Sequence, residues 1–144
     1  MTHTEIVKMA AKWLKRHKQN LVVPNCALVI TEMVCANNSG EVADVIGFSS
    51  SSSVLIEVKV SRSDFYKDKN KLFRRCPFLG MGNLRYYCCP PNLLFLKDLP
   101  SGWGLLYCQD RKPYIEVVAK SQQHEASLAN ERAVLLSHIR RIKK

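Results

Sequence analysis

The sequence lacks the features that would point to a membrane, secreted or zinc-binding protein. No apolar run approaches the roughly 18 residues that a membrane-spanning helix needs. The N-terminus is amphipathic and basic, without a compact apolar segment and a small-residue cleavage site, so it does not resemble a signal peptide. The cysteines form no C-x-x-C pair, which leaves a zinc site weakly supported. Most of them lie in apolar stretches, as buried thiols do in a reducing, cytoplasmic compartment.

Acidic residues are scarce. The chain of 144 residues has 12 Asp and Glu against 22 Lys and Arg, a formal net charge of +10. This excess favours attraction to polyanions, with nucleic acid first and an anionic membrane second. The hydrophobic fraction of 47% is ordinary for a globular protein and is enough for a core.

Apolar periodicity predicts helices and strands but no internal repeat and no interdomain linker. The expected helices span 4–18, 61–75 and 123–143, and the expected strands span 26–34, 41–48, 54–60, 84–89, 103–109 and 114–118. The short serine-rich connection between 41–48 and 54–60 predicts an antiparallel hairpin. The order predicts one α/β domain over 1–144, with helices covering a central sheet.

The strand VLIEVKV at 54–60 has an unusual second face. Val54, Ile56, Val58 and Val60 share one face, while Leu55, Glu57 and Lys59 share the other. The simplest interpretation is that this second face meets solvent, as in many antiparallel sheets.

A second carboxylate, Asp44, interrupts the apolar strand 41–48. In a hairpin it could lie beside Glu57 and Lys59. Two neighbouring carboxylates repel unless a cation lies between them, and their hard oxygens suit Mg²⁺. Lys59 could orient an attacking water or neutralise charge on a phosphate, which is what phosphodiester cleavage requires. The alternative is an ordinary structural ion pair between Asp44 and Lys59 or another base.

These motifs resemble the signature of the PD-(D/E)XK nuclease superfamily. AD at 43–44 followed by EVK at 57–59 is similar to that signature, with Ala in place of Pro. The flanking stretches EVADVIGF, VLIEVKVSRSDFYKDKNK, NLRYYCCPPNLL and LPSGWGLLY are similar to a branch associated with DNA repair and also found in phage and mobile elements. The resemblance covers roughly residues 26–109.

The resemblance implies a restriction-endonuclease-like core of the order α-β-β-β-α-β, with a central mixed sheet flanked by helices. It also implies metal-dependent DNA cleavage in repair, recombination or phage and mobile-element DNA processing. Mg²⁺ would be the cofactor, with Mn²⁺ as a substitute. The protein would be bacterial or phage-encoded.

The resemblance also assigns roles to individual residues. Asp44 and Glu57 would be metal ligands together with the backbone carbonyl of Val58, and Lys59 would be the catalytic lysine. Such sites often gain another acidic residue, and we prefer Glu32 because it interrupts the apolar LVITEMV. Glu5 is better explained as a favourable charge in the first turn of a helix.

The helix after the motif is strongly basic. We expect its cations to bind the phosphate backbone of DNA without base-specific contacts. Any single lysine there could instead belong to a solvated helix face. The cations are Arg62, Lys67, Lys69, Lys71, Arg74 and Arg75. The histidines, which are His3, His17, His124 and His138, are expected on the surface.

Two alternatives to a nuclease remain at this point. One is a nucleic-acid-binding module that keeps the fold without turnover, and the other is a basic adaptor protein whose ion pairs imitate a site. For the nuclease, DNA is the expected partner, no membrane is involved, and a homodimer or a targeting partner protein would fit so short a chain.

Overall fold

The computed structural model describes residues 1–16, 22–33, 40–120 and 126–143. Its elements alternate helices and strands in the expected order. They are α1 (His3–Arg16), β1 (Leu28–Thr31), β2 (Val45–Phe48), β3 (Ser53–Val58), α2 (Arg62–Lys69), α3 (Leu72–Arg75), η1 (Pro77–Leu79), β4 (Leu84–Cys89), η2 (Leu96–Asp98), β5 (Gly104–Gln109), β6 (Lys112–Val117) and α4 (Leu128–Ile142).

The strands form one six-stranded mixed sheet in chain order, β1 to β6. The pairs β1–β2, β2–β3 and β5–β6 are antiparallel, and β3–β4 and β4–β5 are parallel. The predicted hairpin is confirmed as β2–β3, with Val45 opposite Ile56. A central mixed sheet flanked by helices is therefore present.

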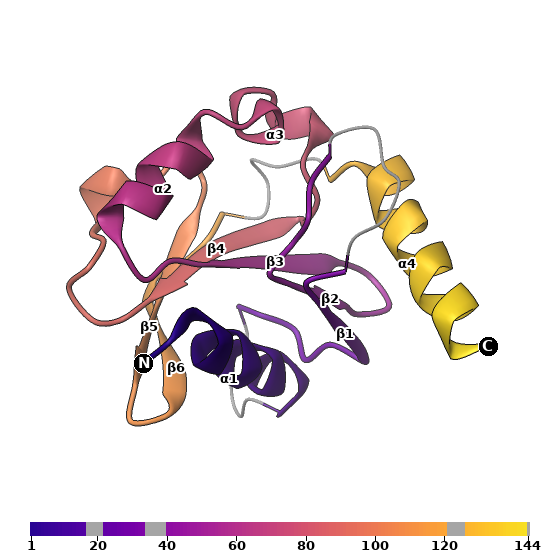
Figure 1. The fold of residues 1–144 in the computed structure, drawn as a ribbon, viewed down its shortest axis with the longest axis horizontal. Helices are drawn as coiled ribbons and strands as arrows, with labels where there is room; N and C mark the ends of the chain where they lie inside the picture. The colour runs from indigo at the N-terminus through magenta and orange to yellow at the C-terminus, as the bar shows by residue number, and fades with distance from the viewer. Residues whose placement is uncertain (17–21, 34–39, 121–125, 144) are drawn as a thin grey trace.

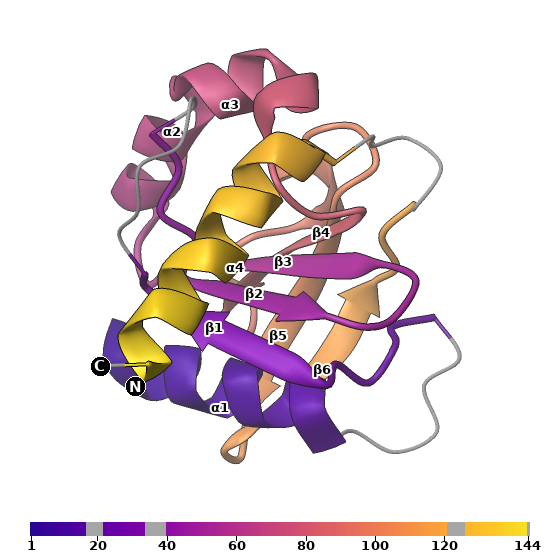
Figure 2. The same cartoon turned by 90° about the vertical axis from the view of Figure 1, so that its right-hand side faces the viewer.

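Helices cover both faces of the sheet. α1 lies on one face, and α2 and α3 lie on the other (Figure 1). Turning the molecule shows α4 crossing the side of β1 and β2 (Figure 2). Ile56 and Val58 join the core beneath α1, while Leu55 joins the opposite core with Phe65 of α2 and Val134 of α4.

Because both faces are covered, the solvent interpretation of VLIEVKV is wrong. Every residue of β3 is buried. Glu57 is only 3% exposed and Lys59, directly after the strand, only 7%. Burying a charge is costly unless it is paired, so both side chains need partners inside the protein.

The predicted helix 61–75 is two helices. Ser61 caps α2 by accepting a hydrogen bond from the Asp64 N–H, as the sequence indicated. The chain then leaves the helix after Lys69, and Lys71 adopts an extended conformation before α3 begins. This break redirects Arg74, which changes its role in the site.

Other boundaries differ by a few residues. β2 begins at Val45, so Glu41 and Asp44 precede the strand that was expected at 41–48. Glu5 and Thr2 form a reciprocal cap at the start of α1, in which each backbone N–H donates to the other side chain. Predictions that fall on 17–21, 34–39 and 121–125 lie outside the described residues. Among the described helices, none is long and apolar enough to cross a membrane.

Candidate functional site

The three residues of the predicted motif line one cavity at the end of β3. The cavity has a volume of about 300 Å³. Its walls come from the start of α1, the segment before β2, the end of β3, and α2 together with Lys71 just beyond it. They are His3, Val42, Asp44, Glu57, Val58, Lys59, Asp64, Lys67, Asp68 and Lys71.

Asp44 is held by the backbone of the neighbouring strand. Its Oδ2 accepts a hydrogen bond of 2.8 Å from the Val58 N–H. One step beyond the Val45–Ile56 pair, the hairpin register brings Asp44 beside Glu57. The expected juxtaposition of the two carboxylates is therefore present, although Asp44 lies just outside the strand.

Glu57 is a buried carboxylate among other carboxylates. Its Oε1 lies 3.4 Å from Nη2 of Arg74. Burial raises the pKa of Glu57 well above its ordinary value; Asp44 and Asp68 raise it further, and Arg74 opposes them. Concentrated negative charge of this kind is what a bound cation would neutralise.

Lys59 pairs with Asp68 and not with Asp44, whereas Asp44 lies 3.3 Å from another base, Nε2 of His3. The Lys59 Nζ lies 3.3 Å from Oδ1 of Asp68, and both side chains are almost fully buried. Lys59 therefore lines the cavity together with Glu57, which lies two positions before it in the chain.

Asp68 is a residue that sequence reasoning missed. It is fully buried and accepts hydrogen bonds from Lys59, Arg74 Nε and the Tyr87 hydroxyl. Burial alone would raise the pKa of Asp68, but Arg74, Tyr87 and Lys59 outweigh it and lower the pKa to about 2. Its isolation on a basic helix was the available signal.

Arg74 corrects another expectation. It was assigned to the DNA-binding surface, but its side chain is 3% exposed and lies within ion-pair distance of Asp68 (2.8 Å), Glu41 (3.1 Å) and Glu57. Burial would lower the pKa of Arg74, but Glu57 and Asp68 raise it above its ordinary value. Arg74 therefore positions the carboxylates and cannot reach a phosphate backbone.

The other cations of this surface divide into two groups. Arg62 donates to both carboxylate oxygens of Asp98 and to the Leu93 carbonyl, so its guanidinium is already engaged. The remaining exposed cations are Lys67, Lys69, Lys71 and Arg75. Lys71 also lies 3.2 Å from Asp68.

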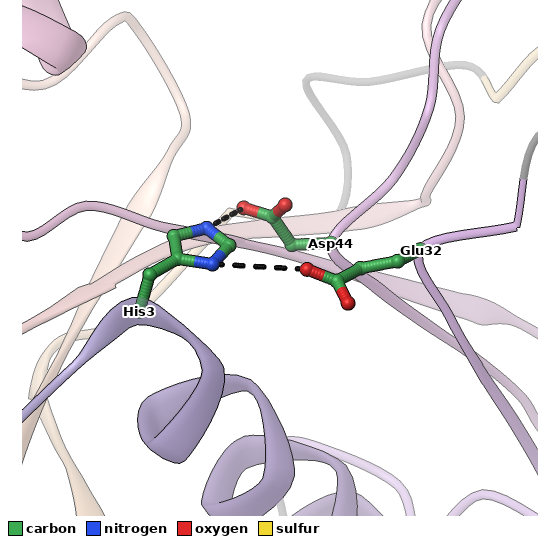
Figure 3. A group of neighbouring side chains, drawn as sticks. All are labelled: His3, Glu32 and Asp44. Carbon is green, nitrogen blue, oxygen red and sulfur yellow. Dashed lines mark hydrogen bonds and ion pairs between the residues drawn. The ribbon is translucent and has the colours of Figure 1, made fainter.

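His3 is not an isolated surface residue. Its ring lies between two carboxylates, with Nε2 3.3 Å from Asp44 Oδ2 and Nδ1 3.7 Å from Glu32 Oε1 (Figure 3). One candidate ligand atom from each residue lies within 4.8 Å of the others. Glu32, 49% exposed, is thus brought near Asp44 but does not itself line the cavity, and Glu5 caps α1.

The backbone explains how Glu32 reaches this position. Its N–H donates to the carbonyls of Ala43 and Asp44, which ties the end of β1 to the segment before β2. No sequence pattern marked His3, because a histidine at the start of a helix has no periodic partner. Of the other histidines, His138 is partly exposed on α4, and His17 and His124 lie outside the described residues.

Comparison with known proteins establishes only the fold. No protein-family model matches the chain, and no curated protein matches it. A solved structure, described as the SPO1766 protein of unknown function from Silicibacter pomeroyi, superposes with a TM-score of 0.67 and 20% sequence identity, covering 98% of this chain and 88% of that one. The chain therefore shares its mixed α/β fold with that protein.

Proposed function

We propose that the protein is a metal-dependent DNA endonuclease that hydrolyses phosphodiester bonds. The observation that carries the proposal is that Asp44, Glu57 and Lys59, from either side of one hairpin, line a single cavity. The order α1, β1, β2, β3, α2, β4 supports a restriction-endonuclease-like core. The function in repair, recombination or phage and mobile-element DNA processing rests on the resemblance alone.

The donor set fits a hard divalent cation. Asp44 and Glu57 offer carboxylate oxygens at the cavity, with the Val58 carbonyl and Glu32 as further oxygen donors, and such ligands suit Mg²⁺ or Mn²⁺. Burial and the neighbouring carboxylates raise the pKa of Glu57, and a cation bound beside it would favour its charged form. When bound, the ion would polarise the phosphoryl group and an attacking water.

Lys59 supplies the positive charge at the reacting phosphate. Asp68 holds its ammonium at 3.3 Å, and Asp68 is itself held by Arg74 and Tyr87. A fixed cation in a partly enclosed cavity stabilises developing negative charge more effectively than a mobile one in water. Exposed Lys67 at the cavity wall, and Lys69 and Arg75 beyond it, would contact the phosphate backbone.

One observation favours the second candidate, a nucleic-acid-binding module without turnover. Arg74 lies 3.4 Å from Glu57 and already offsets part of its charge. If that ion pair excludes a metal, the cavity would hold a phosphate without cleaving it. Cleavage assays separate the two candidates directly.

The test is cleavage of supercoiled plasmid and of labelled single-stranded, duplex and branched DNA and RNA, with Mg²⁺, with Mn²⁺ and with EDTA. Asp44→Asn and Lys59→Met should each lower the rate on the order of 100-fold or more. Matched controls are Glu116→Gln and Lys97→Met, on exposed residues that do not line the cavity.

Cleavage that persists in EDTA, or in both site variants, would contradict the proposal. Binding of DNA by all the proteins without cleavage under any metal would favour the binding module. Cleavage of RNA but not of DNA would support metal-dependent phosphodiester hydrolysis and would show that the substrate is RNA.

A further inference from the structure

A second hollow lies between α1 and the turn that joins β5 to β6. Its volume is about 560 Å³, and five of its eight lining residues are Lys or Arg. The cations are Lys8, Lys12, Arg16, Arg111 and Lys112, and the apolar residues are Met9, Trp13 and Pro113. We call this feature the α1 basic hollow. The turn lies beside α1 in both views of the molecule (Figures 1 and 2).

The charge of the α1 basic hollow is uncompensated within the described part of the chain. No Asp or Glu is among its described lining residues, and no ion pair joins its cations to a described carboxylate. All five cations are exposed. Like charges gathered in a concave surface focus the electrostatic potential and attract an anion.

The apolar residues of the hollow do not project into solvent. Trp13 and Pro113 are buried, and Met9 is partly buried with its sulfur 3.4 Å from the Cys108 sulfur. A surface that enters a bilayer presents apolar side chains outward. Here the outward groups are cations over an apolar floor, which suits phosphates along a polyanion better than a lipid bilayer.

The hollow connects with the candidate site through α1. A neighbouring hollow on the other side of this helix is lined by Lys8, Lys12, Lys15 and Arg16 and reaches Glu32, which contacts His3 at the cavity. α1 has 14 residues and is therefore about 20 Å long, which spans several phosphates of a nucleic-acid strand. Cations thus extend from the Glu32 edge of the site to the β5–β6 turn.

We propose that the α1 basic hollow binds the sugar-phosphate backbone of a nucleic acid whose adjoining segment occupies the candidate site. The choice of nucleic acid as the polyanion rests on the proposed function. The substrate then contacts the protein on the α1 side as well as on the α2 side. The α1 basic hollow supplies cations in place of two that were expected on α2 and α3. Those two are not available to DNA, because Arg74 is buried and Arg62 is bound to Asp98.

The test compares two double variants with the same net charge. Lys12→Glu with Arg111→Glu alters the hollow, while Lys97→Glu with Lys120→Glu alters exposed lysines that do not line it. Binding of labelled duplex and single-stranded DNA is measured by fluorescence anisotropy in EDTA, over a series of salt concentrations. Circular dichroism melts of all proteins verify folding.

The hollow variant should bind DNA at least about tenfold more weakly than the charge-matched control, and its log–log salt slope should fall by about two. Equal weakening in both double variants would overturn the proposal, because only net charge would then matter. So would loss of binding to phosphatidylserine vesicles with DNA affinity unchanged, which would assign the hollow to anionic lipid. DNA binding that depends on the hollow, together with no cleavage under any metal, would support this proposal while contradicting the nuclease.

Discussion

A single carboxylate, Asp68, fixes the positive groups of the candidate site. It is fully buried against Lys59, Arg74 and Tyr87. Asp68→Asn would leave Lys59 without its buried counter-charge and would remove one of the three that Arg74 has, so we expect a loss of about 3 kcal/mol or more in the free energy of unfolding. Urea denaturation measures it. Asp64→Asn, an exposed change on the same helix, should stay within about 0.5 kcal/mol of the wild type; equal effects of the two changes would contradict the role given to Asp68.

Unlike Asp68, Glu57 should be required for cleavage without stabilising the folded protein at alkaline pH. Its pKa is raised by burial. A carboxyl group of this kind contributes stability below its unfolded pKa of 4.5, and the contribution is lost as pH rises through the higher folded pKa. Glu57→Gln removes a proposed metal ligand and should abolish cleavage. Because the charged carboxylate does not stabilise the fold, the melting temperature of this variant near about pH 8 should equal that of the wild type or exceed it.

Thermal melts at about pH 5 and about pH 8, with and without Mg²⁺, test this prediction. Mg²⁺ should raise the melting temperature of the wild type and of the exposed control Glu116→Gln, but not that of Glu57→Gln. A strongly destabilised Glu57→Gln protein at the higher pH would show instead that the ion pair with Arg74 is a major source of stability.

At the scale of elements, a glycine in β2 allows α1 to pack closely against the sheet. A Cβ at Gly47 would lie 2.6 Å from the Cys26 sulfur and 3.0 Å from Cδ1 of Leu14. Gly47→Ala should therefore cost about 1–3 kcal/mol through overpacking. Because α1 carries His3 and also Lys8, Lys12 and Arg16 of the α1 basic hollow, this packing helps to position both proposed binding surfaces.

A double-mutant cycle with Cys26→Ala isolates this contact. Removing the sulfur should restore part of the stability that Gly47→Ala loses, so the two changes should be non-additive by about 0.5 kcal/mol or more in denaturant titrations. Strict additivity would mean that the cost of the alanine arises from the contacts that remain, with the Cys26 Cβ at 2.9 Å and Leu14 Cδ1 at 3.0 Å, or in the strand itself.

The helices α2 and α3 also show where the spacing of apolar residues fails to predict secondary structure. Phe65, Leu72 and Phe73 have helical spacing, so 61–75 was predicted as one helix, yet the chain leaves the helix between Lys69 and Leu72. The break turns Arg74 back toward Asp68 and Glu41. Buried ion pairs determine the course of the chain between α2 and α3. They involve residues such as Glu41, which lie outside the segment whose periodicity predicted the helix.

For the whole molecule, Asp68 predicts a specific loss of stability in acid. Its folded pKa of about 2 lies below the ordinary 3.8, so its contribution is complete above the unfolded value and is lost as pH falls through the folded one. We expect this group alone to account for about 2 kcal/mol of destabilisation between about pH 4 and about pH 2. Carboxyl-carbon NMR titration of the folded protein gives the pKa directly, and a value near 3.8 would contradict the prediction.

The sequence by itself determined the local organisation. Alternation with a period of two identified the strand at 54–60, and the short serine-rich connection identified its hairpin partner, because hairpin pairing depends on neighbouring residues. That pairing was enough to bring Asp44 beside Glu57. The excess of positive charge was also evident, since it needs no folding to be counted.

The tertiary structure alone decided which charges are buried and what they face. His3 reaches Asp44 across 41 positions, and Arg74 reaches Glu41 across 33. A second layer of helices turned an apparently solvent-facing pair, Glu57 and Lys59, into a buried one. Such contacts depend on packing between distant segments, whereas sequence periodicity reports only which face of its own element a residue occupies.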